Sequence, residues 1–256
     1  MIGAAGYSGV EIWVSEIDTY LDEGGTLADL SRFLEDNSLS VPNLIAFFQW
    51  AHPDRAVREG ASAEALEIFQ TANALGCPFV AAPPAGITDI EDVSIAELAD
   101  RYGALLAAAE GTGVIPILEF WGHSKPLKTL DEAVAVLKRT GRPEGRLLVD
   151  VFHMAKGASN IDLLGSLESG RVALLHVNDY PPSDEVEALS DSERVYPGDG
   201  AAPIRRIYSM LRGNGYNGML SLELFHKGYQ HEGAERVLRD GLTKMKNTFE
   251  PLGGTE

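Results

Sequence analysis

Residues 113–225 contain four short apolar runs, Ile115-Pro-Ile-Leu-Glu119-Phe, Leu147-Leu-Val-Asp150-Val-Phe-His153, Val172-Ala-Leu-Leu-His176-Val-Asn-Asp179 and Met219-Leu-Ser-Leu-Glu223-Leu-Phe. Each run is interrupted near its C-terminal end by one Glu, Asp or His. A strand that is buried on both faces reads as such a run, and parallel sheets bury both faces. A buried charged group needs a partner or a metal ion, because an unpaired carboxylate is costly to bury. Four such residues in successive strands therefore indicate that their side chains converge on one site.

Strands and helices alternate along the whole chain. The apolar runs predict strands at 10–14, 41–48, 79–82, 115–120, 147–152, 172–178 and 219–225. Helical periodicity predicts helices after Thr26, at 62–75, after Ser94 and Thr129, and near 160–168, 202–212 and 232–249, with capping boxes at Ser94 and Thr129.

Strict alternation predicts an α/β fold with a parallel sheet and right-handed crossovers. At this length the sheet is a (β/α)8 TIM barrel or a doubly wound sheet. The barrel is favoured because its active site gathers the C-terminal ends of several strands, where the polar residues of the four runs lie. A doubly wound dinucleotide site would need a Gly-rich turn after its first strand, and the sequence has none there.

The predicted strands number seven, one fewer than a (β/α)8 barrel requires. The segment 1–7 has the composition of the tail of a first helix whose strand is missing, and a further βα unit would need roughly 25 to 30 residues. We therefore expect either a natural start upstream of Met1 or a barrel that is open between its ends. An open barrel exposes strand edges that can pair with another chain, which leaves a homo-oligomer open. Residues 1–256 are expected to form a single domain.

The overall composition restricts the classes of partner. The chain has 256 residues, 45% of them hydrophobic, and carries 21 basic against 38 acidic residues, for a net charge of -17. This charge argues against binding to nucleic acid or to an anionic membrane. The single Cys77 excludes an intramolecular disulfide. A secretory signal would require a basic residue near its start, and no Lys or Arg precedes Arg32. Together with the lack of a long apolar run, these features predict a cytoplasmic protein.

Glu119, Asp150, His176 and Glu223 would form a site of three carboxylates and one imidazole if all four face the barrel mouth. A local ion pair explains any one of these residues equally well, but the four together predict one divalent metal ion. The donor set is rich in oxygen and has no thiolate, which suits Mn²⁺ first, Mg²⁺ or Co²⁺ next, and Zn²⁺ as a further alternative. Asp179 follows His176 closely and is predicted to orient its ring.

Two further residues are predicted to contact the substrate or to line its pocket. His153 lies three residues after Asp150, where the strand gives way to a loop, and we expect it to contact substrate. Trp121 shares a strand face with Glu119 and is expected to form an apolar wall. The segment Gly198-Asp-Gly200 precedes a helix and is interpreted as a turn, with a phosphate cradle as the alternative.

Several segments carry a family resemblance. In the second half they are Leu118–His123, Asp150–His153 with Gly157–Asn160, His176–Asp179, Asp191–Gly200 and Ser221–Phe225, and the first half matches more loosely in Gly6–Glu11 and Leu75–Gly76. These segments resemble the xylose-isomerase-like barrel superfamily of sugar isomerases and epimerases. Within it they are most similar to the branch that acts on 2-keto-myo-inositol. The resemblance extends over nearly the whole chain.

The resemblance implies that the four strand-end residues bind one divalent metal, and that His153 and Arg194 contact substrate oxygens. It implies an additional first strand that helps to line the pocket. It further implies a metal-dependent isomerase or epimerase of a keto-sugar or keto-inositol, which transfers a proton next to a carbonyl through an enediol or enediolate. We expect Glu119 and Glu223 on opposite sides of the substrate, one removing a proton and the other delivering one.

Three alternatives share this sequence pattern. A dehydratase-type lyase would form the same enediolate and then expel a hydroxyl group. A phosphodiesterase similar to the apurinic-site endonucleases would need several metal ions and more histidines, whereas this chain has Arg194 and Tyr196 where a further Asp-x-His pair would be required. A catalytically silent binding protein would hold the metal ion without turnover.

Overall fold

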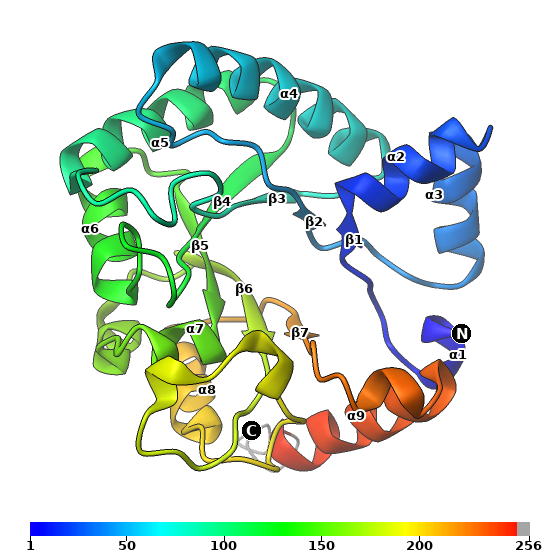
Figure 1. Ribbon diagram of the computed structural model, residues 1–256. Helices are drawn as coiled ribbons and strands as arrows, with labels where there is room; N and C mark the ends of the chain where they lie inside the picture. Colours follow the sequence, from blue (N-terminus) through cyan, green and yellow to red (C-terminus); the bar gives the residue numbers. More distant parts are fainter. Residues whose placement is uncertain (250–256) are drawn as a thin grey trace.

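The computed structural model in Figure 1 describes residues 1–249. Within these residues, seven strands form one curved sheet in chain order from β1 to β7, and every neighbouring pair is parallel. The strands are β1 (Ile12–Trp13), β2 (Leu44–Ile45), β3 (Phe79–Ala82), β4 (Ile115–Glu119), β5 (Arg146–Asp150), β6 (Val172–Val177) and β7 (Leu220–Leu222). The predicted α/β fold with a parallel sheet is confirmed.

Helices cover the outer face of the sheet (Figure 1). They are α1 (Ile2–Ala5), α2 (Val14–Asp22), α3 (Leu27–Asp36), α4 (Arg55–Ala74), α5 (Ile95–Ala109), α6 (Leu130–Thr140), α7 (Val151–Lys156), α8 (Ile204–Gly213) and α9 (Ala234–Phe249), with short 3-10 turns η1 (Ile161–Ser166), η2 (Val186–Ala188), η3 (Asp191–Glu193) and η4 (Tyr229–His231). Both predicted capping boxes, at Ser94 and Thr129, are formed. Among residues 1–249 no helix is both long and apolar enough to cross a bilayer.

The boundaries differ from the prediction in two places that affect the site. The predicted strand 10–14 shrinks to β1, and α2 starts at once with Val14, because Ile17 is buried one turn into the helix and Leu21 packs against the core four residues later. Helix α7 also follows its strand directly. The Asp150 carboxylate accepts a hydrogen bond of 2.7 Å from the backbone N–H of His153 and so caps α7. His153 therefore lies in the first turn of a helix rather than in a loop.

The sheet is open between β1 and β7. Within residues 1–249 these two edge strands do not pair with each other, and a pocket of about 470 Å³ lies between them. Outside the sheet, α1 contacts α9 at the same place. Just after α1, the Tyr7 hydroxyl donates a 3.0 Å hydrogen bond to the carbonyl of Leu238 in α9. The prediction of seven strands is confirmed for the described residues, and their sheet is open between its ends, which is one of the two alternatives that the sequence left.

A small apolar layer fills the inside of the curved sheet below the polar residues. It consists of Ala81, Ile117, Leu148 and Leu174, all at most 2% exposed. Because side chains alternate along a strand, the inward residues two positions further along β4, β5 and β6 are the predicted ligands. The apolar layer therefore forms the floor on which the polar site is built.

Candidate metal centre and substrate pocket

The parallel register places the predicted ligands at one end of the sheet. Glu119 and Asp150 are the last residues of β4 and β5, and Glu223 directly follows β7. Asp150 lies opposite His176 in the pairing of β5 with β6, and His176 lies opposite Ser221 in the pairing of β6 with β7. The strand-end pattern therefore converges in space, as the sequence predicts.

Three of the four predicted ligands form a tight group. Ligand atoms of Asp150, His176 and Glu223 lie within 4.8 Å of one another. His176 Nδ1 is 3.3 Å from Glu223 Oε2 and 3.8 Å from Asp150 Oδ2, and this buried nitrogen has no hydrogen-bond partner in the part of the chain that the structure describes. Glu119 lies outside this group of three but lines the same pocket.

Glu11, a carboxylate outside the predicted ligand set, contacts the second ring nitrogen of His176. His176 Nε2 lies 3.0 Å and 3.1 Å from the two carboxylate oxygens of Glu11. Asn43 Nδ2 in turn donates a 2.8 Å hydrogen bond to Glu11 Oε2. Glu11 interrupts the apolar run 10–14 near its start and not near its C-terminal end, so the strand-end pattern that selects Glu119 does not select it.

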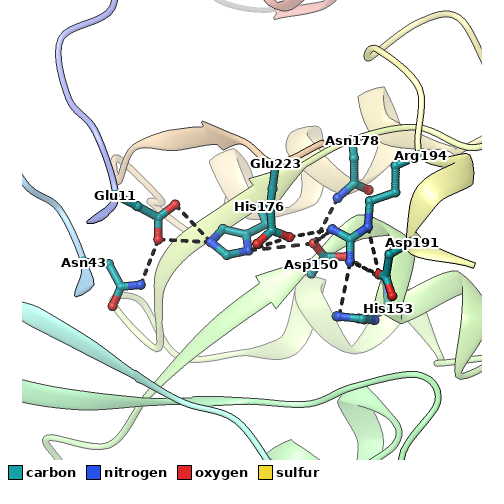
Figure 2. A network of polar contacts seen from close by, with 9 residues as sticks. All are labelled: Glu11, Asn43, Asp150, His153, His176, Asn178, Asp191, Arg194 and Glu223. Carbon is teal, nitrogen blue, oxygen red and sulfur yellow. Dashed lines mark hydrogen bonds and ion pairs between the residues drawn. The ribbon is translucent and has the colours of Figure 1, made fainter. Parts of the chain in front are cut away.

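Arg194 links the acidic residues of the centre (Figure 2). Its Nη1 donates to Asp150 Oδ2 at 2.9 Å and to Glu223 Oε2 at 2.5 Å. Its Nε and Nη2 donate to Asp191 Oδ1 at 3.1 Å and 2.6 Å, and Nη2 lies 3.3 Å from His153 Nε2. All five N–H groups of the guanidinium thus face protein acceptors. Arg194 is 1% exposed, and its predicted contact with substrate stays a prediction.

The charges of the buried centre depend on one another. Burial disfavours the ionised form of Asp150, but the Arg194 guanidinium outweighs it and holds the pKa of Asp150 well below its usual value. Burial likewise disfavours the imidazolium of His176. The carboxylates of Glu11 and Glu223 outweigh this burial and raise the pKa of His176 well above its usual value.

Glu119 and His153 respond to burial in opposite directions. Burial raises the pKa of Glu119 to about 8; the positive charge of His176 opposes that rise, and the carboxylates of Glu223 and Asp150 add to it. Burial lowers the pKa of His153, which favours the neutral ring. If Nε2 of the neutral ring accepts from Arg194, the proton sits on Nδ1, which has no partner within residues 1–249. His153 therefore has a donor to spare, and it lines the pocket.

A pocket of about 460 Å³ opens above the centre and has two unlike halves. The side formed by the later strands carries the charged residues. The side formed by the earlier strands is apolar, with the rings of Trp13 and Phe47 5.1 Å apart and those of Phe47 and Trp121 6.0 Å apart. Phe47 is 43% exposed, which is high for a large apolar side chain. Trp121 therefore lies in a wall of aromatic rings, which agrees with the apolar wall predicted for it.

Asp179 does not orient His176, and that prediction was wrong. Its Oδ2 accepts 3.0 Å hydrogen bonds from the backbone N–H groups of both Gly198 and Gly200, and its Oδ1 accepts one of 2.8 Å from Ala202. Nearness in sequence to His176 gave no indication of these amides, which return from some 20 residues later. The same bonds take up the amides of the glycine segment, so that segment forms a turn and not a phosphate cradle.

Comparison with known proteins places the chain among barrel enzymes. A family model described as "Xylose isomerase-like TIM barrel" matches residues 2–248. An inosose isomerase of Halalkalibacterium halodurans is 30% identical over 240 residues, which cover 91% of this chain and 84% of that protein. A 3-dehydroshikimate dehydratase of Pseudomonas aeruginosa is 25% identical over 251 residues, which cover 95% of this chain but 38% of that protein.

Among solved structures, one described as the IOLI protein with a binding zinc atom superposes with a TM-score of 0.90. The superposition covers 99% of this chain and 92% of that one, at 24% sequence identity. At this identity the likeness shows the fold alone, and it agrees with the barrel sheet described above.

Proposed function

This chain belongs to the xylose isomerase-like TIM barrel family, and on that premise we propose that it is a divalent-metal-dependent isomerase of a keto-inositol, with 2-keto-myo-inositol as the first candidate. The observation that carries the proposal is the convergence of Asp150, His176 and Glu223 within 4.8 Å at the floor of a pocket. The 30% identity to an inosose isomerase over 84% of its length supports the choice of substrate.

The residues of the centre fit a divalent cation. The buried His176 Nδ1, unpartnered within the described residues, and the carboxylates of Asp150 and Glu223 would hold the ion, with Glu119 as a fourth ligand. Three carboxylates and one imidazole suit Mn²⁺ best, and the zinc atom named for the structural relative keeps Zn²⁺ as an alternative. When bound, such an ion supplies Lewis-acid stabilisation of the negative charge that develops on the substrate oxygens.

In this proposal Glu119 and Glu223, which both line the pocket, move the protons. We assign one to remove the proton from the carbon next to the carbonyl, which leaves an enediolate, and the other to deliver a proton to the former carbonyl carbon, while the proton of the neighbouring hydroxyl moves to the former carbonyl oxygen. The product is then a keto isomer of the same mass. Glu119 lines the pocket, and burial disfavours its ionised form when no ion is present. In this proposal His153 contacts the substrate, and Arg194 acts through the groups that it holds in place, Asp150, Glu223 and His153.

The charges of the pocket favour a neutral substrate. Glu119, Asp191 and Glu223 line it together with Arg194, whose N–H groups are committed to protein acceptors. Apart from the metal ion, a substrate carboxylate would therefore find no free cationic side chain among these lining residues. The aromatic wall on the opposite side can pack against the C–H face of a cyclic polyol. This argues for a neutral inosose and against 3-dehydroshikimate, the substrate named for the dehydratase relative.

A lyase that acts on the same neutral substrate is the second candidate, because a relative named as a 3-dehydroshikimate dehydratase matches 95% of the chain. It would share the first proton abstraction and then expel a hydroxyl group as water. Only the mass of the product distinguishes the two reactions.

The test compares two substrates on the Mn²⁺-loaded chain. We expect 2-keto-myo-inositol to yield a keto isomer of unchanged mass, and 3-dehydroshikimate to be unchanged, with products identified by mass spectrometry and NMR. Loss of 18 mass units from 2-keto-myo-inositol would replace the isomerase by the dehydratase. Turnover of 3-dehydroshikimate alone would refute the charge argument. The variant Glu119→Gln serves as the control for contaminating activity.

A further inference from the structure

We propose that Glu11 is a positioning residue, which fixes the His176 ring so that Nδ1 faces the metal centre. The inference rests on the proposed metal centre, because it assigns a role toward that ion to a residue outside the group of ligands. Figure 2 shows the arrangement, in which Asn43, Glu11 and His176 follow one another toward the cluster around Arg194.

The contacts define which ring nitrogen is available. Both Glu11 oxygens lie within 3.1 Å of His176 Nε2, and an ionised carboxylate can only accept a hydrogen bond. Nε2 must therefore carry a proton for the contact to be attractive. Once the ring has lost a proton and is neutral, Nδ1 is the nitrogen that can offer a lone pair, and it is the one that lies 3.3 Å from Glu223 and 3.8 Å from Asp150.

The Glu11 carboxylate is itself held in place. Its side chain is 7% exposed, and Asn43, which is fully buried, donates to it from the segment just before β2. A buried carboxylate with two polar partners has little freedom to rotate, so it restricts the ring as well. Metal-binding histidines commonly donate their other N–H to such a carboxylate, and removal of that carboxylate typically weakens metal binding about 10- to 100-fold.

Two other roles for Glu11 make different predictions. If Glu11 were a direct ligand, the ion would sit on the Nε2 side of the ring and the proton would move to Nδ1. If Glu11 only stabilised the fold, its removal would lower stability without changing ion affinity. The tautomer of His176 and the affinity for the ion therefore decide among the three roles.

The first measurement is the tautomer in the Zn²⁺-loaded full chain labelled with ¹⁵N-histidine. The chain has six histidines, and the variant His176→Gln assigns the relevant ring. We expect long-range ¹H–¹⁵N spectra to show a proton on Nε2 and the ion on Nδ1. A proton on Nδ1 with the ion on Nε2 would overturn the proposal.

The second measurement is Zn²⁺ and Mn²⁺ affinity by calorimetry. Glu11→Ala should weaken binding about 10- to 100-fold, and Glu11→Gln less, because its amide oxygen can still accept from Nε2. Tyr7→Phe is the matched control: it removes a hydrogen bond at the same open seam without contacting His176 and should leave the affinity unchanged. If Glu11→Ala does not fold, Glu11→Gln carries the test through its tautomer and affinity.

Unchanged ion affinity in a folded Glu11 variant would overturn the proposal while leaving the proposed function intact. Failure of the wild-type chain to bind either ion would overturn both. Neither measurement depends on turnover, so a wrong substrate assignment does not affect the result.

Discussion

Replacing Arg194 by methionine should destabilise the ion-free protein strongly. The guanidinium is 1% exposed and donates to Asp150 and Glu223. Methionine preserves much of the apolar stem but leaves the Asp150 carboxylate buried without its counter-charge. Breaking a buried ion pair by removing one partner costs about 3–5 kcal/mol.

The contacts that Asp150 retains set the size of the effect. It still accepts hydrogen bonds from the His153 backbone N–H at 2.7 Å and from Asn178 Nδ2 at 2.9 Å. We therefore expect a loss near the lower end, about 3 kcal/mol. Mn²⁺ at 100 times its dissociation constant should return about 2.7 kcal/mol, because the ion supplies positive charge to the same carboxylates. Since Arg194 no longer competes for these oxygens, the variant should bind Mn²⁺ more tightly. At the same Mn²⁺ concentration, the ion should therefore stabilise the variant more than the wild type.

Urea unfolding followed by circular dichroism, in EDTA and in Mn²⁺, measures both effects. Arg206→Met is the control, because the ion pair between Arg206 and Asp162 is exposed and its loss should change stability by less than about 1 kcal/mol. An Arg194→Met variant that loses less than 1 kcal/mol in EDTA would refute the reasoning. So would a variant that Mn²⁺ stabilises no more than the wild type.

Four further predictions concern three side chains, Glu119, Phe47 and Cys77. Glu119→Gln should lower kcat by about 10²–10⁴-fold; near-wild-type turnover would end its assignment as an acid–base group. Because the folded pKa of Glu119 is about 8, the folded state keeps a proton that the unfolded state loses above about pH 4.3. Stability in EDTA should therefore fall as pH rises through that window by up to about 1.4 kcal/mol per unit, and urea unfolding should show this slope reduced in Glu119→Gln. Phe47→Ala should raise KM for 2-keto-myo-inositol about 2- to 10-fold through lost packing with an unchanged melting temperature, and an unchanged KM would remove Phe47 from the substrate wall. Burial raises the pKa of the Cys77 thiol to about 12, so a thiol reagent should label the protein only in urea; rapid labelling of the native chain would contradict its burial.

The parts of the structure that depend on local sequence were predictable. The capping boxes at Ser94 and Thr129 each require residues three positions apart, and both formed as expected. The strand-end pattern also located Asp150, His176 and Glu223, because a parallel sheet brings equivalent strand ends together whatever the loops between them do.

The parts that depend on contacts between distant segments were not predictable. Asp179 looked like a partner for His176 but instead binds backbone amides of a later loop. Glu11 lies 165 positions from His176 and directly before a strand of two residues, so its pattern was short and its partner remote. Arg194 was predicted to contact substrate, and the sequence could not indicate how many protein acceptors surround it.

In the proposed function, this candidate metal centre isomerises a keto-inositol by proton transfer next to the carbonyl. The most direct measurement is incubation of the Mn²⁺-loaded chain with 2-keto-myo-inositol in D₂O, removal of the ion by chelation, and analysis by proton NMR and mass spectrometry. We predict deuterium on carbon next to the carbonyl and a new keto isomer whose mass differs from that of the substrate only by the label. A chain that binds both Mn²⁺ and 2-keto-myo-inositol but introduces no deuterium would contradict the account.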